Sequence, residues 1–167
     1  MTSILKVSEI QDPTNSNTAL TIDSSGNVNI PQVLTSRAVA FSVYHNSAAA
    51  IAATSSYVKL PYNTANFDSH SAFDFTNDQY VVPVAGVYVF EMSVLQLASM
   101  SSNISFHLNG TAKDPVYRAI TGSTEQNVTG SIVLDCNVND TVDVRIRTTS
   151  GGSYYRIHGG FHGFLIG

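Results

Sequence analysis

The chain has 167 residues and a formal net charge of −4, with 43% hydrophobic and only 12% charged residues. The charged share is about half of the roughly 25% usual in globular proteins, so Ser, Thr and Asn carry the polar surface. An acidic chain whose eight Lys and Arg residues are scattered along the sequence lacks the basic stripe that nucleic acids require, and we expect no nucleic-acid partner.

Residues 1–34 predict a small β unit of their own. Residues 4–7 are expected to form a short strand, and residues 19–22 and 28–31 a hairpin with Gly26 in its loop. Because an isolated hairpin is marginal in water, its apolar side chains need partners from other chains or from a docking surface. We therefore predict a short β anchor or shaft whose anchoring residues are Ile4, Leu5, Val7, Ile10, Leu20 and Ile22.

The second predicted domain, residues 38–167, begins with a strand over residues 38–44. The Ala-rich run 48–53 favours a loop or an edge strand, because it is too short and too poorly capped for a stable helix. Residues 62–79 are polar and rich in turn formers. We expect this segment to be held against the core by its three phenylalanines, Phe67, Phe73 and Phe75.

Residues 82–94 predict the central strand of the core. Alternation gives it an aromatic-rich inward face made of Tyr88, Phe90, Met92 and Val94. The opposite face, with Val87 and Val89 beside Glu91, is also largely apolar. A second surface should therefore cover it, and in a trimer the neighbouring subunit supplies that surface.

The C-terminal half predicts further strands over residues 104–108, 112–120, 128–138, 141–148 and 154–166. On the strand 128–138 the inward set is Ile132, Leu134, Cys136 and Val138. About eight to ten short strands with regular turn signals, such as Asn109-Gly110, indicate a β-sandwich or jelly roll.

The outward positions of these strands carry most of the polar residues. Alternation on the strand 141–148 directs Asp143, Arg145 and Arg147 away from the core. His107 lies opposite an inward apolar set, so we expect it at a solvent-facing or intersubunit position.

A series of short blocks in the second domain resembles one family. These blocks are residues 40–43, 83–90, 108–110, 130–134, 139–142 and 161–166. In this order and spacing they resemble the globular head of complement C1q, the jelly roll shared with tumour necrosis factor. The resemblance implies an all-β, ten-stranded jelly-roll sandwich packed as a homotrimer. The core and trimer-packing residues would be Phe41, Val87, Tyr88, Val89, Phe90, Phe106, Phe161 and Phe164.

The first 30 or so residues resemble a different group of proteins. The words Leu5-Lys6-Val7, Ile10-Gln11-Asp12 and the run 19–26 resemble the opening segment of virion structural (fibre) proteins of tailed phages. The sequence has no collagen-like stem, no secretory leader and no apolar run of about 18 residues that would span a membrane. Cys136 is the only cysteine, which excludes an intramolecular disulfide. We therefore expect synthesis in a host cytoplasm and display on a virion.

No set of catalytic or metal-binding residues stands out. His158 and His162 lie about 13 Å apart on an extended strand, too far to share a metal within one chain, although a three-fold axis would gather three copies of either. The acidic cluster Asp135, Asp140 and Asp143 occupies turn and exposed strand positions instead of forming a carboxylate pair. There is no nucleophile-elbow motif and no calcium-binding Asp run. We expect no enzyme activity, no cofactor and no metal.

These features predict a homotrimeric phage fibre or spike whose C1q-like knob adheres to the host surface. Residues 1–34 would contact other virion proteins, and the knob a host-surface glycan or protein. The candidate receptor contacts are Tyr117, Tyr154, Tyr155 and the loops 62–79, 109–115, 121–127 and 149–154. The alternatives are an architectural capsid-decoration, collar or tail protein with no receptor of its own and, more remotely, a glycan-degrading tail enzyme.

Overall fold

The computed structural model describes residues 9–11, 18–26, 28–29, 38–46, 50–52, 54–120, 122–148 and 153–166. Regular structure in this part of the chain is all β, in the strands β1 to β16. These residues form no helix that could cross a membrane. The chain divides into two compact units, Met1–Arg37 and Ala38–Gly167. The sequence predicted two domains over residues 1–34 and 38–167.

The first unit holds a three-stranded antiparallel sheet. Its strands, in spatial order, are β1 (Glu9–Gln11), β2 (Thr18–Ile22) and β3 (Val28–Asn29). The hairpin expected from the sequence is present, since β2 pairs with β3 across a turn in which Gly26 adopts a φ of 84°. The strand expected over residues 4–7 lies outside the described residues.

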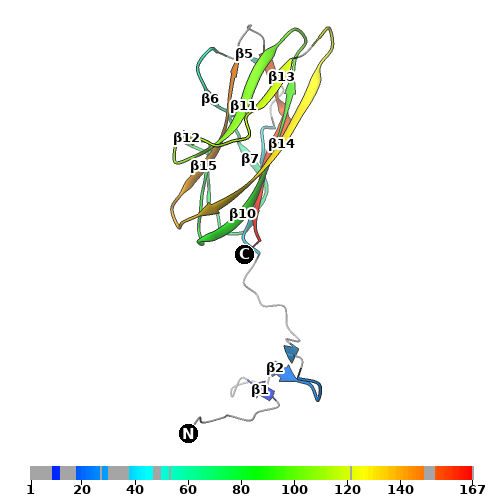
Figure 1. Cartoon of the computed structure of the whole chain (residues 1–167), viewed down its shortest axis with the longest axis vertical. Coiled ribbons are helices and arrows are strands. Elements are labelled where there is room, and N and C mark those ends of the chain that lie inside the picture. Colours follow the sequence, from blue (N-terminus) through cyan, green and yellow to red (C-terminus); the bar gives the residue numbers. More distant parts are fainter. Residues whose placement is uncertain are drawn as a thin grey trace. The chain divides into compact units, whose positions relative to one another are not determined.

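One layer of the second unit is a six-stranded antiparallel sheet (Figure 1). Its order is β14-β10-β16-β4-β7, and β5 pairs with β16 off this path. Its strands are β4 (Ala40–Tyr44), β5 (Ala50–Ala52), β7 (Thr64–Asp68), β10 (Gly86–Gln96), β14 (Gln126–Cys136) and β16 (Ser153–Leu165). The predicted central strand, β10, does lie between two long partners, and β14 pairs with it from Gly86 to Gln96.

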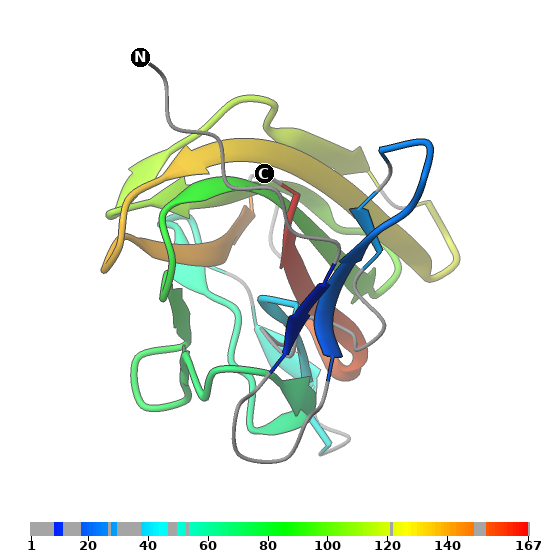
Figure 2. The same ribbon diagram turned by 90° about the horizontal axis from the view of Figure 1, so that it is seen from below.

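The other layer is a seven-stranded antiparallel sheet, which Figure 2 shows from a second direction. Its order is β12-β11-β15-β9-β8, with β13 paired to β11 and β6 paired to β15. Its strands are β6 (Val58–Lys59), β8 (Phe73–Asp74), β9 (Gln79–Val81), β11 (Ser101–Leu108), β12 (Thr111–Ala112), β13 (Tyr117–Ile120) and β15 (Thr141–Thr148). Asn109 and Gly110 take φ angles of 51° and 78° between β11 and β12, so this pair forms the tight turn that its sequence predicts.

The core between the two sheets is built from aromatic rings. Phe41 stacks on Tyr80 with ring centroids 4.0 Å apart and meets Phe161 edge-on at 4.9 Å. Phe90 stacks on Tyr88 at 5.6 Å. Such pairs add about 0.5–1.5 kcal/mol each beyond the area that they bury. Gly163 leaves room for two of these rings, because a Cβ there would lie 2.5 Å from Phe41 and 2.7 Å from Phe90.

Several local expectations are confirmed and others are wrong. Residues 50–52 of the Ala-rich run form the edge strand β5, and Cys136 is buried. Only Phe73 of the three phenylalanines in 62–79 is buried, whereas Phe67 and Phe75 are 53% and 42% exposed. Val138 is 51% exposed instead of inward, because β14 ends at Cys136 and Val138 belongs to the turn that follows.

Candidate interaction surfaces

The outer face of the six-stranded sheet carries an apolar row. Val133 on β14, Val89 on β10 and Phe164 on β16 are direct cross-strand neighbours. Val133 is 59% exposed and Phe164 is 43% exposed, while Val89 between them is half-buried. Contiguous apolar side chains on a protein surface are a feature of interaction sites. We call Val133, Val89 and Phe164 the apolar row.

A polar row runs beside the apolar row on the same face. Ser131, Glu91, His162 and Ser42 are cross-strand neighbours on β14, β10, β16 and β4. His162 Nδ1 lies 2.8 Å from the Ser42 hydroxyl. Burial lowers the pKa of the His162 imidazole, and the charge of Glu91 opposes that effect. A hollow of about 490 Å³ opens over this row, between Glu91, Ser131 and His162.

Tyr117, a candidate receptor contact, connects the two sheets. It pairs with Ile104 on β11, and its ring packs against the core beside Phe106. The Ser131 N–H donates to the Tyr117 hydroxyl at 2.9 Å, and that hydroxyl in turn donates to the Ser131 carbonyl. A Cβ on Gly130 would lie 2.6 Å from this ring. The ring is therefore a structural link across the opening of the sandwich.

The outer face of the seven-stranded sheet centres on a buried carboxylate. Asp143 on β15 is 1% exposed, and Arg145 binds it with two hydrogen bonds, at 2.6 Å from Nε and 2.9 Å from Nη2. Lys59 Nζ lies 3.3 Å from the same carboxylate. The prediction that Asp143 is exposed is therefore wrong. Its side chain points out of the sandwich as expected, but it is buried because β6 places Lys59 over it. The hydrogen bonds to Asp143 raise the pKa of Arg145.

His107 is also buried rather than solvent-facing, at 5% exposure. Its Nε2 lies 3.0 Å from the Ser105 hydroxyl and its Nδ1 lies 3.1 Å from the Gly110 carbonyl. The ring of Tyr57 covers it edge-on at 5.4 Å. Burial lowers the pKa of His107, which favours the neutral imidazole.

The remaining predicted positions fall into three groups. The side chains of Phe41, Tyr88, Phe90, Phe106 and Phe161 are buried within one subunit, while Val87 is half-buried on the outer face. Among the anchoring residues, Ile10 pairs with Leu20 in the first unit and Ile22 is 39% exposed. The structure does not describe Ile4, Leu5 and Val7, nor the side chains of Tyr154, Tyr155 and His158.

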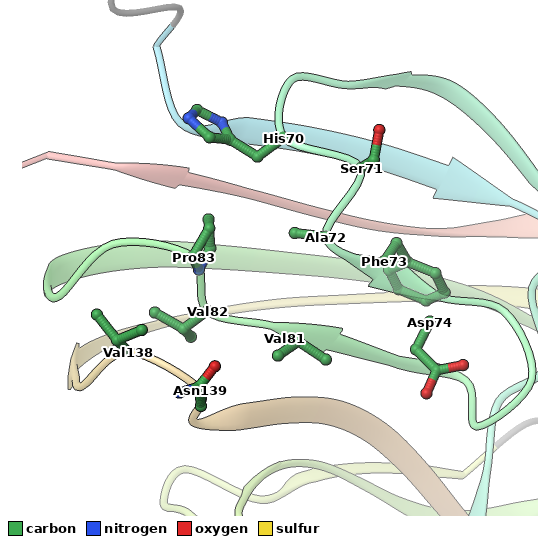
Figure 3. A pocket seen from close by; sticks show the side chains of 10 residues that line it. All are labelled: His70, Ser71, Ala72, Phe73, Asp74, Val81, Val82, Pro83, Val138 and Asn139. Carbon is green, nitrogen blue, oxygen red and sulfur yellow. The ribbon is translucent and has the colours of Figure 1, made fainter.

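A second hollow, of about 340 Å³, lies beside the segment that precedes β10 (Figure 3). His70 and Asp74 are its titratable lining residues, and Figure 3 shows them at opposite ends of the lining, pointing away from each other. Hydrogen bonds from Asn77 hold the pKa of the Asp74 carboxyl below its usual value. This arrangement offers no acid–base pair. Within the described residues, no three His, Cys, Asp or Glu side chains gather as a metal site would require.

Comparison with known proteins gives a consistent picture. The sequence model of the C1q domain family matches residues 40–166. The globular domain of a zebrafish complement 1qA protein superposes with a TM-score of 0.62 at 19% identity, covering 78% of this chain and 98% of that one. A tumour necrosis factor of S. frugiperda, Eiger, gives a TM-score of 0.57 at 12% identity over 78% of this chain and 93% of that one.

Among curated proteins, the chain is 27% identical over 106 residues to an uncharacterized protein, YqcC, of Bacillus subtilis (strain 168). The match takes in 58% of this chain but only 29% of that protein, so the chain spans less than a third of its relative's length. This relative says nothing about activity.

Proposed function

Because the chain belongs to the C1q domain family, we propose that it is a non-enzymatic, homotrimeric knob that displays binding surfaces. The apolar row is the observation that carries this proposal, since Val133 and Phe164 are large apolar side chains left exposed in one subunit. In a trimer, the second and third copies would cover these side chains around a three-fold axis. That packing would bury the outer face of β10, which the sequence analysis predicted to be covered. Obligate interfaces have this apolar character.

The trimer also explains how weak binding sites become useful. Loops at the ends of a rigid sandwich are usual places for recognition. Three copies of each loop on one knob, and many knobs on one particle, raise the effective concentration of the second and third binding events. We therefore assign the knob an adhesive role.

We further propose that this knob is a virion structural protein displayed on the surface of a tailed phage. The support is the resemblance of the first 30 or so residues to phage fibre proteins. The compact first unit agrees with a separate attachment segment. Its sheet of short strands exposes Ile22 and Val28, which are 39% and 59% accessible and suit packing against another virion protein.

Two measurements test this role. Antibodies against residues 38–167 should label intact particles at regular positions, and the isolated trimer should bind host cell envelopes more tightly than a monomeric variant. Labelled particles without any envelope binding would favour an architectural decoration, collar or tail protein. Unlabelled particles would refute the virion role.

A further inference from the structure

The fold brings together cationic residues that are far apart in the sequence. Four of the eight Lys and Arg residues lie on the outer face of the seven-stranded sheet, namely Lys59, Arg118, Arg145 and Arg147. Asn103 on β11 pairs with Arg118 on one side and with Arg147 on the other. Since direct cross-strand neighbours point to the same face, both guanidinium groups lie on one surface of a chain whose net charge is −4.

The positive charge of this face is not evenly balanced. Asp143 neutralises the end near β6, where it contacts both Lys59 and Arg145. Lys59 also lies close to two further carboxyls: its charge adds to the hydrogen bonds from Asn77 that lower the pKa of Asp74, and it opposes the burial that raises the pKa of Asp78. At the other end, Arg118 and Arg147 have no carboxylate partner among the residues that the structure describes. The uncompensated charge is therefore concentrated between β13 and β15.

Arg147 is held in place by two contacts within the chain. Its guanidinium lies over the ring of Tyr57, 4.8 Å from the ring centroid. With the Asn103 amide oriented to satisfy both neighbours, its oxygen accepts a hydrogen bond from Arg147 Nη2 at 3.0 Å. A side chain fixed by stacking and hydrogen bonding loses less conformational entropy on binding. Arg118, by contrast, is exposed and can adapt to a ligand.

We propose that this surface, made of Arg118, Asn103, Arg147 and Tyr57, binds an acidic polysaccharide. A planar guanidinium forms paired hydrogen bonds with a carboxylate or a sulfate group. Strand spacing separates Arg118 from Arg147 by about 10 Å, so two acidic sugars of one polymer can meet different guanidinium groups. Tyr57 positions Arg147 by stacking, and the Asn103 amide retains hydrogen-bonding capacity for sugar hydroxyls.

A polysaccharide fits this surface better than a nucleic acid does. The patch offers two arginines without a carboxylate partner, while the rest of the acidic chain repels a long polyanion such as duplex DNA. The inference deepens the adhesive role proposed above by naming a class of ligand. It concerns a face opposite the apolar row, so each subunit carries the whole surface, and trimerisation multiplies binding without creating it.

The test measures binding of the full chain to immobilised polygalacturonate (a carboxylated sugar polymer), dextran sulfate (a sulfated one), neutral dextran and duplex DNA. We expect binding to one or both acidic polysaccharides and none to neutral dextran. The Arg118→Gln/Arg147→Gln variant should bind about tenfold more weakly, as the loss of two charge-assisted contacts implies. The matched control Lys6→Gln/Arg37→Gln removes the same charge from the first unit and should bind as the native chain does.

Two further variants separate a loss of ligand binding from misfolding and from loss of the trimer. The single Arg118→Gln variant changes an exposed side chain, so a loss of binding there cannot be ascribed to misfolding. The monomeric Val89→Asp variant should lose avidity yet keep an affinity per site that depends on Arg118, which separates this inference from the trimer itself. No binding to either acidic polysaccharide, an equal loss in the Lys6→Gln/Arg37→Gln control, or equally tight binding of duplex DNA would each overturn the proposal.

Discussion

The two outer faces of the sandwich differ in the kind of side chain that they leave to solvent. On the outer face of the six-stranded sheet, the apolar row is open, and Glu91 and Asp135 are charged residues that the structure describes there. On the seven-stranded sheet, Arg145 and Lys59 contact the Asp143 carboxylate, which is itself buried. One face is built to lose water against an apolar partner, and the other to hold charged groups in water. We infer that assembly and ligand binding are divided between the faces.

The largest effect should come from placing a charge in the apolar row. Val89→Asp puts a carboxylate at the centre of the proposed subunit interface, where an unpaired buried charge costs several kcal/mol. We expect the trimer to be lost at micromolar concentration while the subunit stays folded, because Val89 points away from the core. Size-exclusion chromatography and circular dichroism measure the two properties.

The matched control for that variant is Val116→Asp. Val116 is 39% exposed and lies outside the six-stranded sheet, so the same charge there should leave assembly unchanged. A Val89→Asp protein that stayed trimeric and equally heat-stable would show that this face does not form the interface.

The second effect tests the buried carboxylate of the other face. Asp143→Asn leaves Lys59 and Arg145 without their shared anion, but both side chains are about a quarter exposed and can turn to water. We therefore expect a loss of about 2 kcal/mol in the free energy of unfolding, with assembly intact. Urea denaturation of a monomeric background measures it. Asp135→Asn, on the exposed edge strand of the other sheet, should change that free energy by less than about 0.5 kcal/mol.

A smaller effect is expected from Val133, at one end of the apolar row, where a substitution should weaken assembly without weakening the fold of one subunit. Val133 is 59% exposed in one subunit, so Val133→Ser should leave the stability of a monomer nearly unchanged. In the trimer the same change should cost about 1 kcal/mol per subunit, from the apolar area no longer buried. Sedimentation equilibrium compares the two proteins. An equal loss of stability in monomer and trimer would contradict the assignment of this face.

The smallest effect is a pH dependence that separates the two histidines. Burial lowers the pKa of both His107 and His162 in the folded chain, so the unfolded chain binds more protons once the pH falls below about 6.5, the ordinary histidine pKa. Stability is therefore fully present above that pH and falls as the pH falls. His107→Gln should reduce this slope in a monomeric background. His162→Gln should reduce the slope in the same monomeric background and, because His162 borders the apolar row, should also change the pH dependence of assembly. Assembly with the same pH dependence in both proteins would count against the interface.

Strand alternation predicted the sandwich, the central place of β10 and the inward position of its aromatic rings, because these depend on local sequence. It could not predict what covers an outward side chain. Asp143 and His107 are buried because β6 and Tyr57, from a distant segment, pack over them. Tyr117 faces inward because β13 pairs with β11 in a register that no local pattern encodes. Arg118 and Arg147 likewise lie on one surface only because β13 and β15 both pair with β11 at Asn103.

The molar mass of the native protein in solution tests the division between the two faces most directly. Light scattering coupled to size-exclusion chromatography should give three times the chain mass of 17.9 kDa, and the value should hold on dilution through the micromolar range. A stable species of 17.9 kDa would mean that the apolar row is not an assembly surface, and the account of that face would be wrong.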